Sequence, residues 1–420
     1  MEGIDKKKLL MVGFFVNVFE WYDFSVFAFL ASAIGVIFFN ETNPHIYLIK
    51  AFMVFLISYL ARPFGSIFFG YLADHYGRAL ALKSSLLLMA IPTFLIGLLP
   101  TYHVAGNLAL TLLILLRLLQ GFAAGGELPG STCYMYEASP DEEKNFYCSL
   151  VAASSMLGVF MGSFTVTLLY TVFSKENMLS WGWRIPFLFG FIIAIFIFYV
   201  RNMIAETDTF QKIKSLRLNR NYFKNLLQYK RQISQVFLLN SFISVSFYTL
   251  FVWMPSYLTV YLNIKESMAH LTNTISLFAL IIFTLLIGYV SRTRDRKKWI
   301  LCGVITMLIF SYPLFIFLQL KKIAILIAVQ IVFALFLSFI DGVINATMGS
   351  LFHPQIRAMG IGIGFTFSTA IFGGLSPMLS SWLASYEARV EYPVILIIIT
   401  AIVALPAVRW LYKDQENFSA

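Results

Sequence analysis

Charged and amide side chains inside long apolar stretches are the residues of this 420-residue chain that could do chemistry. A charge at the centre of a membrane-spanning helix costs about 2.5 to 3.5 kcal/mol, so it is retained where it is paired or functional. Asn17, Glu20 and Asp23 follow one another at intervals of three residues in the first apolar stretch. This spacing predicts one broad helix face that must point away from lipid, towards a cavity or other helices.

Four further charges have the same character: Arg62 in the second apolar stretch, Arg117 and Glu127 in the fourth, and Asp341 in the tenth. Two interpretations of the arginines stay open. In one, they only neutralise the buried acids within a packed bundle. In the other, an arginine binds a substrate carboxylate through two parallel hydrogen bonds, while a carboxylate shielded from water takes up a proton.

Residues 70–78 follow the second apolar stretch and contain two glycines, an acid and a base. Residues 288–296 are a copy of this segment that keeps fewer of these residues. Glycine allows close helix approach, and an acid and a base at helix ends can cap helices and pair across a gate. The offset of the two copies is close to half the chain, which predicts a duplication of six-helix units with a site between them. The gating candidates are Gly70, Asp74, Gly77, Arg78 and, as a partner of Arg78, Glu137.

The composition indicates the elements that must position these residues. Hydrophobic residues make up 59% of the chain, charged residues 12%, and the mean hydropathy is +0.78, so the solvent around the chain must be largely lipid. Apolar stretches bounded by charges, proline or glycine predict twelve helices in two sets of six. They cover residues 10–39, 46–73, 80–99, 106–136, 145–173 and 181–204, then 232–262, 269–291, 299–318, 323–351, 356–386 and 392–412.

The net charge of +10 is explained by its placement. With a cytoplasmic N-terminus, twenty-two of the 31 Lys and Arg residues fall on the cytoplasmic side, seven fall outside, and Arg62 and Arg117 lie within spans. Both termini are therefore predicted to be cytoplasmic. The polar segment 205–231 suits either a surface helix on anionic headgroups or a solvated connector.

Several classes of protein are excluded by what the sequence lacks. The three cysteines are scattered singly and the histidines form no cluster, so we expect neither disulfides nor a metal site. Nucleophile elbows and phosphate loops are missing, which argues against an enzyme and against a cofactor. The basic charge indicates membrane lipid and not nucleic acid as the partner. The first apolar stretch is too long for a signal-peptide core and is interpreted as a retained span.

At these residues the chain resembles the metabolite:proton symporter family of the major facilitator superfamily. The resemblance covers nearly the whole length. It rests on Asn17-Val-Phe-Glu20-Trp21-Tyr22-Asp23-Phe24, Arg62-Pro63-Phe64-Gly65, the segment 70–78, Arg117-Leu-Leu-Gln120-Gly121 with Gly125-Gly126-Glu127, Trp181-Gly182-Trp183-Arg184-Ile185-Pro186-Phe187, Glu206-Thr207 with Phe210, and Ile371-Phe372-Gly373-Gly374-Leu375-Ser376-Pro377.

This resemblance implies an all-α membrane fold of twelve transmembrane helices in two six-helix bundles, at 1–204 and 232–420, joined by a cytoplasmic loop at 205–231. It implies a cavity alternately open to either side and proton-coupled uptake of an osmolyte, amino acid or organic acid. The short segment after Tyr412 argues against an osmosensing role. Departures from the family pattern are His75, Ala79, Arg292 and Ser350 at gate positions, and Asp341 where the family usually has an uncharged residue.

We therefore expect a monomeric proton symporter in the bacterial inner membrane that imports a small solute by alternating access. An exchanger or facilitator of the same solutes, or a sensor that binds without turnover, stays an alternative. The proton-coupling candidates are Glu20, Asp23 and Glu127. The substrate-binding candidates are Arg62, Arg117, Asn17, Tyr22, Trp21, Tyr248 and Asp341.

Overall fold

The computed structural model describes residues 10–11, 14–15, 17–76, 78–125, 127–202, 228–292, 295–353, 356–386 and 390–418, and all regular structure in these ranges is helical. Lipid offers backbone groups no hydrogen-bond partner, so apolar stretches close their hydrogen bonds within helices. The helices of the N-terminal half are α2 (Val18–Phe29), α3 (Ala31–Phe38), α4 (Pro44–Tyr76), α5 (Arg78–Leu98), α6 (Tyr102–Ala105), α7 (Asn107–Ala124), α8 (Glu127–Ala138), η1 (Asp141–Glu143), α9 (Lys144–Val172), α10 (Lys175–Ser180), η2 (Gly182–Arg184) and α11 (Ile185–Asn202).

The C-terminal half follows the same plan of long helices, which here include three π-helical segments. Its elements are α14 (Lys230–Phe247), η3 (Tyr248–Val252), α15 (Met254–Ser256), η4 (Tyr257–Tyr261), α16 (Glu266–Val290), α17 (Arg296–Leu318), α18 (Ile323–Ser350), α19 (Arg357–Ser368), η5 (Thr369–Gly373), α20 (Gly374–Ser385) and α21 (Val394–Phe418).

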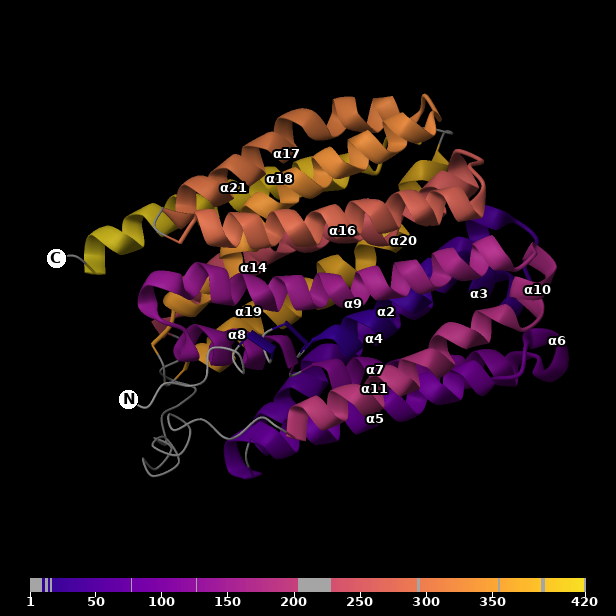
Figure 1. The fold of residues 1–420 in the computed structure, drawn as a ribbon, viewed down its shortest axis with the longest axis horizontal. Helices are drawn as coiled ribbons and strands as arrows, with labels where there is room; N and C mark the ends of the chain where they lie inside the picture. The colour runs from indigo at the N-terminus through magenta and orange to yellow at the C-terminus, as the bar shows by residue number, and fades with distance from the viewer. Residues whose placement is uncertain are drawn as a thin grey trace.

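Among the described residues, ten helices are long and apolar enough to cross a membrane, and the bent pair α2 and α3 makes an eleventh span. The apolar part of α5, Lys83–Leu98, is shorter and supplies the twelfth. Figure 1 shows these helices along the long axis, with α17, α18 and α21 on one side of the molecule, α5, α7 and α11 on the other, and α9 and α16 in contact between them. The predicted fold class, a membrane protein of twelve helices in two six-helix bundles, is confirmed.

Four predicted spans are less regular than the hydropathy pattern suggested. The first changes direction by 62° between α2 and α3, the fourth is divided into α7 and α8, and the seventh and eleventh contain π-helical segments. Hydropathy reports the apolar length of a segment and carries no information about its direction or hydrogen-bond register. The predicted connector 205–231 lies outside the described residues up to 227, and its last two residues belong to α14.

Glycine brings α4 and α7 into direct backbone contact. A Cβ atom on Gly65 would lie 1.7 Å from the carbonyl oxygen of Phe122, and one on Gly121 would lie 1.8 Å from that of Ser58. Only a residue without a side chain fits at such a distance. This contact holds the two arginine-bearing helices of the N-terminal half together.

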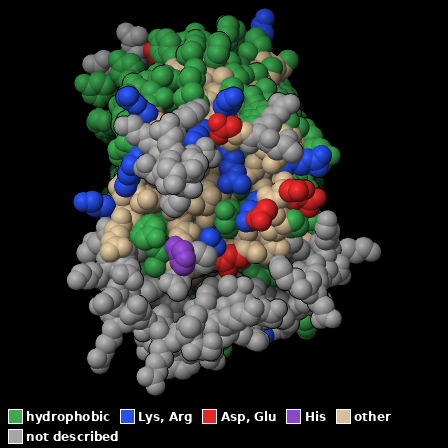
Figure 2. Space-filling view, turned by 90° about the vertical axis from the view of Figure 1, so that its left-hand side faces the viewer, with side chains coloured by type: hydrophobic (Ala, Val, Ile, Leu, Met, Phe, Trp, Pro, Cys, Tyr) green, Lys and Arg blue, Asp and Glu red, His purple; other side chains and the backbone are tan. Residues whose placement is uncertain are grey.

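Charged side chains gather at one end of the molecule, here called the basic end, while apolar side chains cover the flank (Figure 2). Lys144, Arg296 and Arg357 begin helices α9, α17 and α19 at this end. At the opposite end lie the start of α10 at Lys175 and the start of α16 at Glu266. The bilayer must therefore surround the apolar flank between the two ends.

Candidate functional site

The first buried ion pair joins α2 to α4. Arg62 Nη1 lies 3.3 Å from Glu20 Oε1, and both side chains are almost fully buried. The Arg62 guanidinium carbon also lies 4.1 Å from the ring centres of both Phe24 and Tyr59, a cation–π distance. The pair is thus enclosed by aromatic side chains of its own half.

The second buried ion pair joins α2 to α7. Arg117 Nη1 lies 3.8 Å from Asp23 Oδ2, and both side chains are fully buried. Thr93 and the Gln120 amide donate hydrogen bonds of 2.7 and 2.8 Å to Asp23 Oδ1, and Arg117 donates one of 3.0 Å to Gln120 Oε1. The carboxylate therefore has a charged partner and two hydrogen-bond donors, which is what a buried acid requires.

The ring of Phe24 separates the two pairs. It lies 4.1 Å from the Arg62 guanidinium carbon and 5.0 Å from that of Arg117. The two acids predicted on one face of the first helix, Glu20 and Asp23, therefore have different arginine partners.

A small cavity of about 80 Å³ lies between the two halves. It is lined from both halves, by Trp21, Leu128, Ala152, Ser155 and Met156 and by Asn240, Ile243, Ser244, Phe247, Tyr248, Asp341, Ile344, Asn345, Met348, Phe365 and Thr369. Of the predicted substrate-binding residues, Trp21, Tyr248 and Asp341 line it. Arg62, Arg117, Asn17 and Tyr22 are not among the described residues that do.

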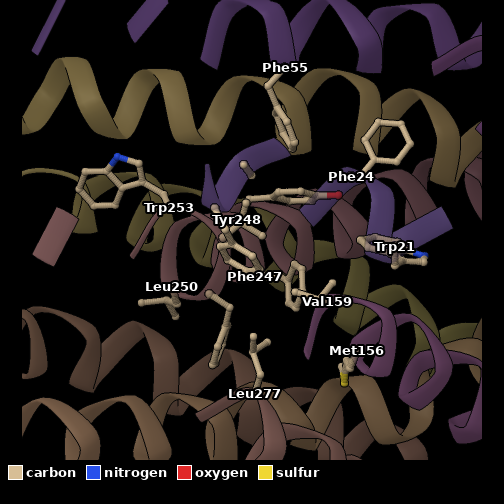
Figure 3. Close-up of a cluster of buried hydrophobic side chains, with 14 of the residues drawn as sticks. Trp21, Phe24, Phe55, Met156, Val159, Phe247, Tyr248, Leu250, Trp253 and Leu277 are labelled. Carbon is tan, nitrogen blue, oxygen red and sulfur yellow. The ribbon is translucent and has the colours of Figure 1, made fainter. Parts of the chain in front are cut away.

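Tyrosine hydroxyls connect the cavity with the first ion pair. Tyr248 Oη lies 2.5 Å from Tyr59 Oη across the interface between the halves, and Tyr59 packs on Arg62. Figure 3 shows Tyr248 among Trp21, Phe55 and Phe247. A solute in contact with Tyr248 would be two side chains away from Arg62.

At the basic end the halves are closed by polar contacts. Arg357 of α19 forms a 2.8 Å ion pair with Glu137 of α8 and donates a second hydrogen bond to the Gly349 carbonyl oxygen. Asn145 of α9 donates to the Ser291 carbonyl oxygen at 2.7 Å and accepts from Arg296 at 2.5 Å. These contacts join the two halves at the basic end.

The halves are also in contact nearer the opposite end. Ser163 of α9 is hydrogen-bonded to Thr274 of α16 at 2.7 Å, and Lys175 lies 3.5 Å from Glu266. The Tyr59–Tyr248 contact lies on this same interface. The cavity residues Ser155 and Met156 therefore lie along α9 between two sets of contacts that join the halves.

The sequence pattern described as "Sugar (and other) transporter" matches residues 9–220, and the pattern described as "Major Facilitator Superfamily" matches residues 236–419. The chain belongs to the major facilitator superfamily. Within this superfamily it is 30% identical over 407 residues to the proline/betaine transporter of Escherichia coli K12, covering 93% of this chain and 80% of that protein. Together these matches confirm the family predicted from the sequence, the metabolite:proton symporter family.

Other superfamily members agree with this assignment. A putative proline/betaine transporter of Staphylococcus haemolyticus is 30% identical, with 100% of this chain and 90% of the relative covered. The partially occluded inward-open structure of the Escherichia coli xylose transporter XylE superimposes with a TM-score of 0.75 at 14% identity, covering 97% of both chains. The protein is therefore a multi-pass membrane transporter of small solutes, in a family of transporters and not of enzymes.

Of the other residues predicted for the site of this superfamily member, those that the structure describes neither line the cavity nor belong to the two buried ion pairs. Asn17 exchanges hydrogen bonds of 3.2 and 3.3 Å with Ser131. Tyr22 donates a 2.8 Å hydrogen bond to the Pro186 carbonyl oxygen inside the N-terminal half. The side chains of Glu127, Asp74 and Arg78, the surroundings of Gly70 and all of Gly77 lie outside what the structure describes. Glu137, predicted as a partner of Arg78, is seen paired with Arg357.

Several polar residues of the interface were missed by sequence reasoning. Arg357 and Asn145 close the basic end, and the only signal for them was a polar residue at a predicted helix start. Asn240 lines the cavity and donates to Ser368 at 2.6 Å and to Thr369 at 2.9 Å. These side chains are neutral or lie near a helix end, so hydropathy does not distinguish them from other polar residues.

Proposed function

We propose that the protein imports a small zwitterionic osmolyte or amino acid by proton symport across the bacterial inner membrane, acting as a monomer. The observation that carries this proposal is the buried Asp23–Arg117 pair, whose acid lies on the same helix α2 that supplies Trp21 to the cavity wall. A buried acid with a single charged partner is a group whose protonation changes local pairing. The relatives named as proline/betaine transporters support the solute class.

Asp23 is the proposed proton carrier. A proton on this carboxylate removes its attraction for Arg117, while Thr93 and Gln120 keep the side chain in place. The released guanidinium then changes the packing of α2 against α7. Because both helices belong to the half that closes on the cavity, protonation biases the equilibrium between the two open states.

Glu20 is the second candidate and is closer to the solute. Its partner Arg62 packs on Tyr59, which is hydrogen-bonded to the cavity residue Tyr248. A solute that displaces Tyr248 therefore disturbs the Glu20–Arg62 pair. This chain of contacts gives a physical route for coupling between solute and proton.

The basic end is proposed to face the cytoplasm. Lysine and arginine are enriched on cytoplasmic surfaces of membrane proteins, and they gather at this end, with Arg296 and Arg357 among them (Figure 2). With this orientation, both termini are cytoplasmic. The contacts of Ser163 with Thr274 and of Lys175 with Glu266 then lie towards the outside.

The test is uptake of labelled proline and betaine into proteoliposomes with an imposed inward proton gradient. We expect the wild-type protein to accumulate one of them, and D23N to equilibrate it without accumulation while retaining counterflow. The matched control is D141N, because Asp141 is exposed and, among the described residues, its ion pair is with nearby Lys144. D141N is expected to accumulate solute normally.

Other outcomes separate the alternatives. Accumulation by the wild type that ignores the gradient contradicts symport, and counterflow without accumulation indicates an exchanger or facilitator. Solute binding without any flux indicates a sensor. Uptake of a di- or tricarboxylate instead of proline or betaine contradicts the zwitterionic solute class and leaves proton coupling intact.

A further inference from the structure

Asp341 differs from every other buried carboxylate whose side chain the structure describes within the spans. It lies in the middle of α18, is 5% exposed, and lines the cavity between the halves. Among the described residues, no group donates a hydrogen bond to its Oδ2 atom, and no lysine or arginine forms an ion pair with it. A buried carboxylate of this kind is costly unless something else binds it.

The cavity around Asp341 offers no positive side chain to a solute. Neither lysine, arginine nor histidine is among the described residues that line it. The two arginines of the N-terminal spans are occupied by Glu20 and Asp23. The described cavity wall therefore has one carboxylate and otherwise neutral side chains, which favours a cationic group in the cavity.

Three aromatic rings on the cavity wall add a second attraction for a cation. Phe247 lies edge-on to Trp21 at 6.1 Å and to Tyr248 at 5.5 Å between ring centres. Trp21 and Tyr248 are 6.4 Å apart and inclined by 31°, and Figure 3 shows the three side chains together. Aromatic rings gathered in this way bind ammonium groups through their negative faces.

Neutral hydrogen-bonding groups complete the wall. Asn240, Ser244 and Thr369 come from the C-terminal half, and Ser155 from the N-terminal half. Hydroxyl and amide groups can donate to the carboxylate of a zwitterion without the charge of an arginine. The cavity thus has different chemistry for the two ends of such a solute.

From these observations we propose that Asp341 and the rings of Trp21, Phe247 and Tyr248 form a cation subsite that binds the ammonium group of the solute. This inference rests on the proposed function and names the part of the solute that is selected. The subsite is separate from the Asp23–Arg117 pair, so solute selection and proton uptake use different acids. It also predicts exclusion of solutes that carry only negative charge.

The experiment compares two ligands of the same shape. Betaine and 3,3-dimethylbutanoate share a carboxylate and a bulky tetrahedral head, and only betaine has a positive nitrogen in it. Binding to the protein in lipid nanodiscs, without any gradient, is measured by titration calorimetry. We expect the wild type to bind betaine at least about tenfold more tightly than the isostere.

Variants assign this preference to Asp341. D341N is expected to lower betaine affinity about tenfold and to leave affinity for the isostere nearly unchanged or higher. D341E should restore part of the preference because it restores the charge. The matched control I344V changes the same cavity wall without a charge and should keep the preference.

Each remaining outcome overturns the inference. A wild-type protein that does not distinguish the two ligands has no cation subsite, and a preference that survives in D341N does not come from Asp341. Neither result bears on proton coupling, which is measured by gradient-driven uptake and D23N. Conversely, if the proteoliposome test shows no proton coupling, the preference for betaine can still be measured by binding in nanodiscs, for the wild type and for D341N.

Discussion

The two halves of the transporter handle buried charge in opposite ways. In the N-terminal half, Glu20 and Asp23 each have an arginine from a neighbouring helix. In the C-terminal half, Asp341 has no such partner among the described residues, although it is also buried. Both arrangements put acids in lipid-surrounded helices, but among the described residues only the first gives each acid a charged partner.

In the proposed mechanism this difference gives the two halves different roles. A paired acid holds its half together and responds to a proton by releasing its partner. An acid without a partner leaves its attraction available to a solute. The interpretation of the arginines as internal partners fits the described contacts better than direct substrate binding, because neither arginine is among the residues that line the cavity.

The largest effect is expected from removing one member of a pair. R117A leaves Asp23 buried without its cation and should lower the free energy of unfolding by about 3 to 5 kcal/mol. The double variant D23N/R117Q should recover most of this loss. Unfolding in detergent measures both, and the control K50A, in the half-buried Lys50–Glu41 pair at the surface, should change stability by less than about 1 kcal/mol. Equal losses in R117A and K50A would remove the contrast between the halves.

A smaller effect of opposite sign is expected in the C-terminal half. D341N replaces a buried carboxylate oxygen without a partner by a neutral amide, so the solute-free protein should become more stable by about 1 kcal/mol. The same unfolding experiment measures it. A destabilisation like that of R117A would indicate that Asp341 has a partner within the protein.

The smallest effect is expected at the contact between the halves, where a substitution should change the population of open states. Y59F removes the hydroxyl that contacts Tyr248, and a hydrogen bond of about 1 kcal/mol corresponds to about a fivefold change in the population of open states. Distances between spin labels at Val104 and Leu320, both exposed, report this opening. Exposed Cys302 is first replaced by serine.

The matched control for this opening is Y261F. Tyr261 donates its hydroxyl to the Ser381 carbonyl oxygen within the same half, so its loss should not change the distance between halves. If Y59F and Y261F give the same distances as the wild type, the tyrosine contact does not hold the halves together.

The sequence was sufficient for the helix count and for the polar face of the first span, because apolar length and residue spacing are local properties. It could not choose between the two interpretations of Arg62 and Arg117. Their partners come from helices distant in the chain, and the pairing depends on how each helix is rotated in the bundle. Glu137 shows the same limit, since its described partner Arg357 belongs to the opposite half.

Asp341 was conspicuous in the sequence as a charge in an apolar stretch, but its lack of a partner was not. Whether Asp341 has a partner depends on whether the helices that face it carry a lysine or arginine at the same depth. The neutral residues of the cavity, such as Asn240 and Thr369, gave no signal at all. Sequence reasoning thus finds buried charges, and the packing decides what they do.

The π-helical segments at Tyr248–Val252 and Thr369–Gly373 begin with two residues of the cavity wall. Trp253 N–H bonds to the Tyr248 carbonyl oxygen five residues back, one residue more than an α-helix uses. Deleting one residue here would restore α-helical register and turn the preceding side chains by about 100° relative to the rest of the helix. Single-residue gaps in alignments of these two helices are therefore as informative about solute choice as amino-acid substitutions.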